Sequence, residues 1–220
     1  MHLPRLAPNT ELIETMRLNR HGQILLLDLH LERLAHSALH FGFAFNKAAV
    51  LRALAPYLHQ CYPQAQRLRL SLASNGALTI QCSPLLVTPQ PVWVVLAPRP
   101  IQTEARYLCH KTTVRSHWAT GEKWLQQHPA YFDVIYYDDR GFITEGGRSS
   151  VYVQQHSQWF TPPCTQALLP GVQRAALLQQ GLVQEKHLTV TELLAAPQLR
   201  VSNALRGWLD ARLKVINGFS

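Results

Sequence analysis

The sequence predicts a mixed fold, α+β in its first half and α/β overall, divided into two domains. Short β-type segments alternate with helical segments along the whole chain. Five prolines between residues 84 and 100 mark a connection between two halves. With 220 residues, the chain can bury one large core or two small ones. We therefore expect a small N-terminal α+β domain at residues 1–100 and a larger C-terminal domain at residues 101–220.

The first predicted elements are a hairpin and two helices. Residues 11–18 and 23–27 are apolar β-type runs around the turn Asn19–Gly22, which predicts a hairpin. Asp28 is placed to cap the next helix, and Gly42 to end it. A second helix is expected at residues 46–59, starting at Asn46.

The later elements follow from alternation and turn residues. Residues 67–72 alternate strictly between polar and apolar side chains, and Ser74–Gly76 forms a hairpin turn into residues 77–82. Further strands are expected at 92–96, 133–137, 142–145, 151–154, 158–161 and 199–202. Helices are expected at 115–127, from 172 to before Gly181, and from Thr189.

Composition and charge indicate an ordinary globular protein. Hydrophobic residues make up 47% and charged residues 15% of the chain, with a net charge of +8. The basic residues are scattered, which argues against nucleic-acid binding and suits a small anionic substrate. The four cysteines form no C-x-x-C pair and indicate a reducing compartment. The N-terminal residues lack a signal-peptide core and no membrane-length apolar run occurs, so we expect a cytoplasmic protein without membrane contact.

Lys111 and Glu145 are the main candidates for chemistry. Lys111 follows the segment Tyr107–His110, and an amine in a partly apolar setting loses its proton more easily and can attack an aldehyde. Glu145 ends a β-type run and precedes two glycines, which let a planar ligand approach the backbone. A carboxylate there can keep a pyridine nitrogen protonated, as pyridoxal phosphate requires.

Other segments offer groups for a phosphate. Gly171 and Val172 open a helix whose free N–H groups can face an anion. Ser202 and Asn203 form a polar pair just after a strand, and Arg33 lies on an apolar-faced helix where it needs an anionic partner or a path to solvent. His36 and His40 are four residues apart on one helix, with His30 earlier on it, but a metal site needs a third convergent ligand and no H-E-x-x-H motif accompanies them, so no metal is expected.

Several motifs together resemble the class IV aminotransferase family, the pyridoxal phosphate enzymes of fold type IV. The resemblance runs from about Leu12 to Leu213, and its most specific pieces are KTTVR at residues 111–115 and NALRG at residues 203–207. The other pieces are LIETMR at 12–17, LLDLHLERL at 26–34, TEGGRSS at 144–150, FTPP at 160–163 and LLPGV at 168–172. Within the family, the motifs are most similar to those of the 4-amino-4-deoxychorismate lyases, including the lyase-like half of fused aminodeoxychorismate synthases.

The resemblance implies a D-amino-acid-aminotransferase-like architecture of two domains, with pyridoxal 5'-phosphate between them and Lys111 in the C-terminal one. Lys111 would form the internal aldimine and move protons, and Glu145 would pair with the pyridine nitrogen. The implied phosphate ligands are Arg33, Gly171, Val172, Ser202 and Asn203, and the implied substrate contacts are Thr15, Arg115 and Arg206. A homodimer is expected, with an aminodeoxychorismate synthase as a further candidate partner.

The expected reaction is the conversion of 4-amino-4-deoxychorismate to 4-aminobenzoate and pyruvate in the folate pathway. Two alternatives stay open at this point: a branched-chain or D-amino-acid aminotransferase of the same fold, and a binding or scaffold protein that has lost catalysis. The third reading is motivated by Ser150, where the family usually has asparagine. It is also motivated by the family's upstream segment, which is largely missing before Leu12 and which walls the substrate pocket in longer relatives.

Overall fold

The computed structural model describes residues 6–219, and the chain packs into two compact units. The first unit runs to Val87 and also contains His110–Val114; the second contains Thr88–Cys109 and everything from Arg115 onward. Residues 1–5, on which the expectation of no signal peptide and the start of the predicted N-terminal domain fall, lie outside the described residues.

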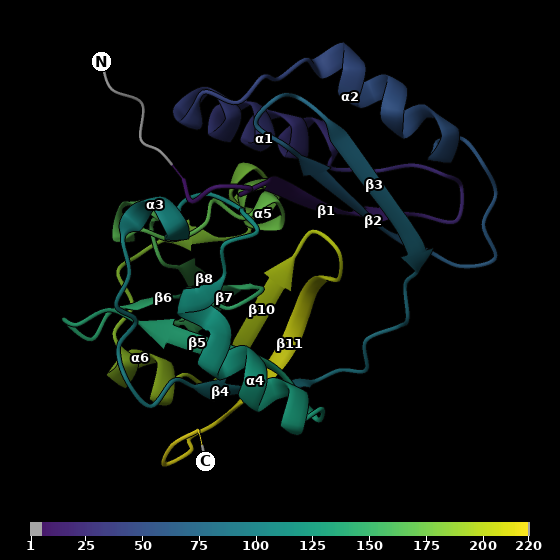
Figure 1. Cartoon of the computed structure of the whole chain (residues 1–220). Coiled ribbons are helices and arrows are strands. Elements are labelled where there is room, and N and C mark those ends of the chain that lie inside the picture. Colours follow the sequence, from purple (N-terminus) through teal and green to yellow (C-terminus); the bar gives the residue numbers. More distant parts are fainter. Residues whose placement is uncertain (1–5, 220) are drawn as a thin grey trace. The chain divides into compact units, whose positions relative to one another are not determined.

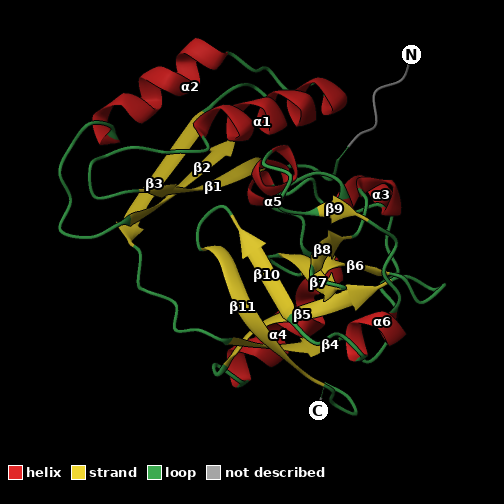
Figure 2. Cartoon of the chain, turned by 180° about the vertical axis from the view of Figure 1, so that it is seen from behind, coloured by secondary structure: helices red, strands yellow, loops and turns green. Residues whose placement is uncertain are grey.

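The first unit is a three-stranded antiparallel sheet covered by two helices on one face (Figures 1 and 2). Its strands lie in the order β1-β2-β3 and are β1 (Leu12–Leu18), β2 (Gln66–Leu72) and β3 (Leu78–Pro84). The helices are α1 (Leu27–Phe41) and α2 (Lys47–Leu54), the latter followed by a 3-10 turn at Ala55–Tyr57. Leucines of β1 and β2 pack against Leu31, Leu34 and Ala38 of α1 to form the core of this unit.

The predicted hairpin between residues 11–18 and 23–27 is wrong. β1 pairs with β2, and residues 23–27 form a turn in which the Leu27 N–H donates to the Ile24 carbonyl. Helix α1 therefore begins at Leu27, so Asp28 lies in its first turn instead of capping it. The expected end is confirmed, because Gly42 has a φ of 72° and its N–H bonds to helix carbonyls.

The segment His110–Val114 extends the first unit. The Ile13 N–H donates to the Lys111 carbonyl at 2.9 Å, and the Thr113 N–H donates to the Glu11 carbonyl at 2.9 Å. A β-bridge joins Leu12 to Thr112. The unit boundary therefore lies after Val87, not at residue 100 as predicted, and Lys111 belongs to the first unit instead of the second.

The second unit is built on an eight-stranded mixed sheet in the order β6-β5-β4-β11-β10-β7-β8-β9. The strands are β4 (Val92–Leu96), β5 (Tyr131–Tyr137), β6 (Ile143–Gly146), β7 (Ser150–Gln155), β8 (Gln158–Thr161), β9 (Gln184–Glu185), β10 (Leu199–Asn203) and β11 (Gly207–Lys214). The Gly146 N–H donates to the Ser149 carbonyl at 2.7 Å, so the edge strand β6 returns beside β7 and the sheet curls on itself.

Four helices belong to this unit: α3 (Ala105–Leu108), α4 (Ala119–Gln127), α5 (Val172–Gln179) and α6 (Val190–Leu194). Trp118, Trp124 and Leu125 pack with Val134 and Tyr136 of β5. Helix α6 begins with a capping box between Thr189 and Glu192. Among the helices of residues 6–219, none is both long and apolar enough to span a bilayer.

Candidate active site

Three elements of the second unit end or begin at one place. Ser150, the first residue of β7, pairs in register with Ser202 near the end of β10. A Cβ atom at Gly171, just before α5, would lie 2.6 Å from the hydroxyl oxygen of Ser150. Glu145 of β6 accepts a hydrogen bond from the Leu169 N–H at 3.1 Å, in the segment that leads into α5. The structure thus joins Glu145 to the segment before α5 and places Gly171 beside Ser150, the strand partner of Ser202. The cofactor roles of Glu145, Gly171, Val172 and Ser202 stay predictions.

Glu145 is buried at the end of β6, with 6% of its surface exposed. Its strand neighbours Ile143 and Thr144 are also buried, and Gly146 follows it against the carboxylate of Asp133. A buried carboxylate requires hydrogen-bonded or cationic partners. The Leu169 N–H is one such partner, at 3.1 Å from the Glu145 carboxylate.

The start of α5 has features that are typical of anion-binding sites. Its N-cap residue, Gly171, has a φ of −61° and has no side chain that could accept from the first N–H groups of the helix. Only a residue without Cβ lets the Ser150 hydroxyl come this close to the helix start. The first amides of α5, its dipole and the nearby Ser150 hydroxyl are groups that suit a phosphate, and Ser202 pairs with Ser150 in the sheet; their roles in phosphate binding stay predictions.

Ser202 and Asn203 have clear partners in this structure. The Ser202 hydroxyl lies 2.6 Å from the Tyr152 hydroxyl, which is fully buried; burial raises the pKa of Tyr152 to about 12 despite the bond to Ser202. The Asn203 amide nitrogen donates to the Arg148 carbonyl at 3.1 Å, and its oxygen accepts from the Arg206 N–H at 2.9 Å. Asn203 therefore stabilises the backbone around the site.

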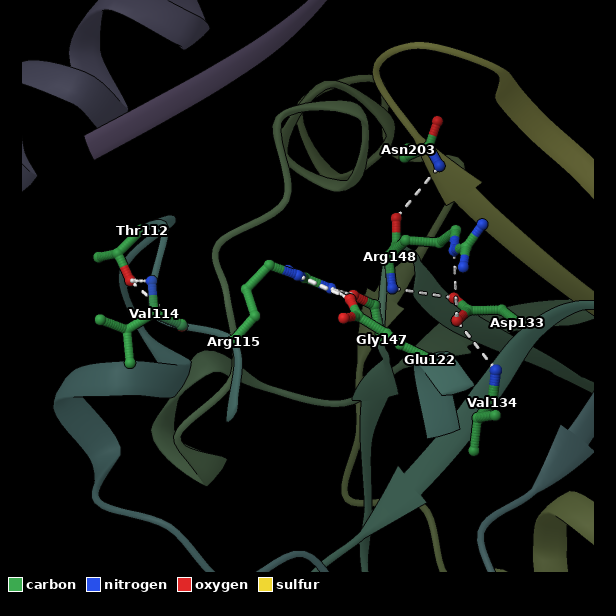
Figure 3. A network of polar contacts seen from close by, with 9 residues as sticks. All are labelled: Thr112, Val114, Arg115, Glu122, Asp133, Val134, Gly147, Arg148 and Asn203. Carbon is green, nitrogen blue, oxygen red and sulfur yellow. Dashed lines mark hydrogen bonds and ion pairs between the residues drawn. The ribbon is translucent and has the colours of Figure 1, made fainter. Parts of the chain in front are cut away.

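Lys111 lies in the first unit, where β1 holds it through its backbone. The Val114 N–H donates to the Thr112 hydroxyl at 3.2 Å and closes a turn after Lys111 (Figure 3). The preceding residue, His110, is buried and packs against α1, with its Nδ1 atom 2.9 Å from the Ser37 hydroxyl oxygen. Burial, followed by the neighbouring His40 and His36, lowers the pKa of His110 to about 4. Lys111 is therefore carried on an anchored segment.

Arg33 satisfies the expectation that it needs an anionic partner. Its Nε and Nη2 atoms donate to the two carboxylate oxygens of Glu14 at 2.8 and 2.6 Å, and His30 binds the same carboxylate at 2.6 Å. Burial would raise the pKa of Glu14, but Arg33 and His30 outweigh it and hold that pKa at about 2. The role of Arg33 in phosphate binding stays a prediction, and the ion pair fixes its position on α1.

The predicted substrate residues lie in different surroundings. Thr15 is half-buried on β1 opposite Arg69 of β2. The Arg206 side chain donates to the Thr88 hydroxyl at 2.6 Å. The Arg115 guanidinium bonds to Glu122 and donates to the Gly147 carbonyl at 2.6 Å (Figure 3). Their contacts with substrate stay predictions.

Three residues near these positions were not predicted from the sequence: Asp133, Tyr152 and Glu14. Asp133 and Tyr152 are fully buried polar side chains on strands, and Glu14 is nearly so. A charged or hydroxyl side chain inside an otherwise apolar β-type run was the available signal. Within residues 6–219, no group of three histidine, cysteine or acidic side chains is arranged to hold a metal ion.

Comparison with known proteins relates the chain to one family. The model of the class IV amino-transferase family matches residues 11–213. A Schizosaccharomyces pombe protein named as a candidate aminodeoxychorismate lyase is 29% identical over 170 residues, which cover 74% of this chain and 72% of that protein.

Solved structures share the fold. A candidate amino-acid aminotransferase from Mesorhizobium loti is 32% identical, with a TM-score of 0.83 over 94% of this chain and 100% of that chain. A hypothetical aminotransferase from Mycobacterium tuberculosis in its pyridoxal phosphate-bound form is 20% identical, with a TM-score of 0.77 over 97% of this chain and 86% of that chain. The chain therefore belongs to the class IV aminotransferase family, whose members depend on pyridoxal phosphate.

Proposed function

We propose that the protein is a pyridoxal phosphate-dependent lyase that releases pyruvate from 4-amino-4-deoxychorismate and leaves 4-aminobenzoate. The observation that carries the cofactor is the buried carboxylate of Glu145 beside the uncapped start of α5. The lyase assignment is supported by the KTTVR and NALRG motifs and by the name of the Schizosaccharomyces pombe relative.

The residues divide the work by their chemistry. The α5 amides, Ser150 and Ser202 would hold the phosphate with Arg33, and the Glu145 carboxylate would keep a proton on the ring nitrogen. When bound, the cofactor supplies an electron sink for the charge left on the substrate. The Lys111 amine would bind the cofactor aldehyde in the resting state and then, once displaced by the substrate amine, accept and donate protons at the reacting carbon.

A second candidate function is amino-acid transamination. The 32% identity to the Mesorhizobium loti protein, named as a candidate amino-acid aminotransferase, favours it. Transamination needs a keto acid as amino acceptor, whereas elimination of pyruvate does not. Purified protein is therefore supplied with 4-amino-4-deoxychorismate alone, and pyruvate and 4-aminobenzoate are measured. Equal amounts of both, without a keto acid, support the lyase; pyruvate that forms only with an added acceptor rejects it.

The cofactor is tested separately from the reaction. We expect protein incubated with pyridoxal phosphate to absorb near ~410–430 nm, as a lysine-linked cofactor does. Borohydride reduction followed by peptide mass spectrometry should place the label on Lys111, and Lys111→Ala should abolish both results. A protein that lacks the band would have lost the catalysis and kept only the fold, whereas a label at another lysine would reject Lys111 as the lysine that binds the cofactor.

We also propose a small dianionic substrate and a homodimer as the working form. The net charge of +8 is compatible with an anionic substrate. Sedimentation with and without the cofactor measures the oligomeric state, and a monomer under both conditions would reject the dimer. Association with an aminodeoxychorismate synthase is tested by adding that enzyme to the same experiment.

A further inference from the structure

The connection between β6 and β7 links two residues proposed for the cofactor. Glu145 lies at its start and Ser150 at its end, with only Gly146, Gly147, Arg148 and Ser149 between them. Two glycines in four residues leave this backbone with much conformational freedom in the unfolded chain. Something must therefore hold the connection if the carboxylate and the hydroxyl are to keep their places.

The side chain of Asp133, on β5, is hydrogen-bonded to this connection. Its Oδ2 atom accepts hydrogen bonds from the Ser149 hydroxyl at 2.6 Å and from the Arg148 N–H at 3.1 Å. Its Oδ1 atom accepts from the Val134 N–H at 2.9 Å, and the Arg148 Nε atom lies 4.0 Å away. The side chain is completely buried, and burial raises its pKa even though these partners favour the charged form. Burial of a carboxyl group is unfavourable unless its oxygens are hydrogen-bonded, so we interpret Asp133 as a residue that stabilises the backbone it binds.

The connection packs against this carboxylate without spare room. A Cβ atom at Gly146 would lie 2.3 Å from the Asp133 Oδ2 atom and 2.7 Å from the Ser149 hydroxyl oxygen. Gly146 therefore has to be glycine because the acid occupies the space of a side chain. The residue after Glu145 is thereby fixed to Asp133 by contact as well as by hydrogen bonds nearby.

Two further side chains hold the same connection (Figure 3). The Arg115 Nη2 atom donates to the Gly147 carbonyl at 2.6 Å, while its Nε atom donates to Glu122 at 2.8 Å. The Asn203 amide donates to the Arg148 carbonyl at 3.1 Å. Successive residues of the connection are thus bound from β5, from the segment before α4, and from the end of β10.

We propose that Asp133 is a positioning residue that holds Glu145 and Ser150 in the geometry of the cofactor site, and that Arg115 is a second tie on the same backbone. The inference rests on the proposed function, because Glu145 and Ser150 matter only if they face the cofactor. It assigns Arg115 a task that does not require contact with the substrate.

The test compares Asp133→Asn with a matched variant. Asn keeps the size of the side chain but offers one acceptor oxygen in place of two, so either Ser149 and Arg148 or Val134 lose their partner. Asp138→Asn is the control, because Asp138 binds Arg140 and the Phe142 N–H at the other end of the same β5–β6 hairpin. Both variants change a carboxylate on this hairpin, but only one touches the connection.

The readouts are the dissociation constant of pyridoxal phosphate and hydrogen exchange of the peptide containing residues 146–150 in cofactor-free protein. We expect Asp133→Asn to weaken cofactor binding about tenfold and to speed exchange in that peptide, on the scale of one or two lost hydrogen bonds. Asp138→Asn should change neither. A variant that is less stable to urea but keeps wild-type affinity and exchange would show that Asp133 serves the fold alone and would overturn the proposal.

Two further variants keep the test decisive. If Asp133→Asn does not fold, Ser149→Ala retains the acid and removes its shortest bond, and we expect a smaller change in the same direction; no change in either readout overturns the proposal. Arg115→Gln should weaken cofactor binding, whereas a rise in KM at unchanged cofactor affinity would return Arg115 to a substrate role. If the wild-type protein binds no cofactor, the proposed function fails, and the exchange data still decide whether Asp133 holds the connection.

Discussion

The Nδ1 atom of His110 lies 2.9 Å from the hydroxyl oxygen of Ser37, and the ring stacks on His40 with centroids 4.5 Å apart. The residue before Lys111 is thus packed on α1 as a neutral ring. Burial, then His40 and His36, lower its pKa from 6.5 to about 4. The His110 ring is therefore protonated near pH 6.5 in the unfolded chain but only near pH 4 in the folded protein.

Stability should consequently fall as the solution is acidified from about pH 6.5 towards pH 4, because only the unfolded state gains this proton. The contribution is fully present above pH 6.5. His110→Asn keeps a polar group near Ser37 without this titration and should flatten that part of the profile, measured as urea midpoints at several pH values. His156→Asn, at the exposed β7–β8 turn, is the control; an equal flattening by both variants contradicts the assignment.

Glu14→Gln should destabilise the protein strongly. The carboxylate is buried and bound by both Arg33 and His30, so the change leaves a buried guanidinium with a weaker partner. Loss of one partner of a buried ion pair costs about 3–5 kcal/mol. Urea unfolding measures it, with Glu104→Gln in the exposed pair with Arg106 as the control, expected within about 0.5 kcal/mol of wild type. Similar losses in the two variants would mean that burial does not matter here.

The Glu14 carboxylate should also make the stability of the protein depend on pH, in a second and more acidic range. Its folded pKa of about 2 lies below the ordinary 4.5, so its contribution to stability is complete above about pH 4.5 and is lost as the pH falls towards 2. This pH dependence should be absent from the urea profile of Glu14→Gln. A variant that keeps the wild-type slope between pH 4.5 and 2 would assign that slope to other groups.

Gly171→Ala tests the start of α5. The new methyl group would lie 2.6 Å from the Ser150 hydroxyl oxygen, which must move away from the helix start. We expect phosphate and pyridoxal phosphate affinity to fall about tenfold, with partial recovery in Gly171→Ala/Ser150→Ala. Gly218→Ala, where nothing lies within 4 Å of the added atom, should bind as wild type does. Unchanged affinity in Gly171→Ala would remove this helix start from the site.

Gly121→Ala should destabilise the second unit because the added Cβ atom would clash with the Tyr136 hydroxyl oxygen. The added Cβ would lie 2.0 Å from the Tyr136 hydroxyl oxygen, and both residues are buried where α4 packs on β5. Overpacking of this kind costs about 1–3 kcal/mol. The double variant Gly121→Ala/Tyr136→Phe removes the clashing oxygen and should recover most of the loss in urea midpoint. Failure to recover would place the strain in the helix backbone.

Local patterns predicted most elements of the fold but not their partners. Strand β2 and the turn Ser74–Gly76 follow directly from alternation and turn residues. The run at residues 23–27 is as apolar as a strand, yet the partner of β1 lies about fifty residues later in β2, which no local pattern specifies. Strand β11 was not predicted from the sequence; it pairs antiparallel with the neighbouring β10 and parallel with β4, which lies more than a hundred residues away.

The candidate site divides in a similar way. Glu145 and Gly171 lie in segments with recognisable chemistry, a carboxylate after a strand and a glycine before a helix. The tasks of Asp133 and Glu14 depend on Ser149 and Arg33, which lie 16 and 19 residues along the chain. Only the paired strands and the packed helix bring these side chains together, so sequence alone shows an acid in an apolar run and not its purpose.

The return of His110–Val114 to the first unit has a consequence for inheritance. The chain leaves that unit after Val87, re-enters it at His110 and leaves again after Val114, so neither unit is encoded by one uninterrupted stretch of gene. A recombination breakpoint anywhere from residue 88 to residue 109 would join the β1 of one parent to the Lys111 of another. A single crossover therefore cannot exchange one whole unit for another, and we expect β1 and the segment that carries Lys111 to be inherited together.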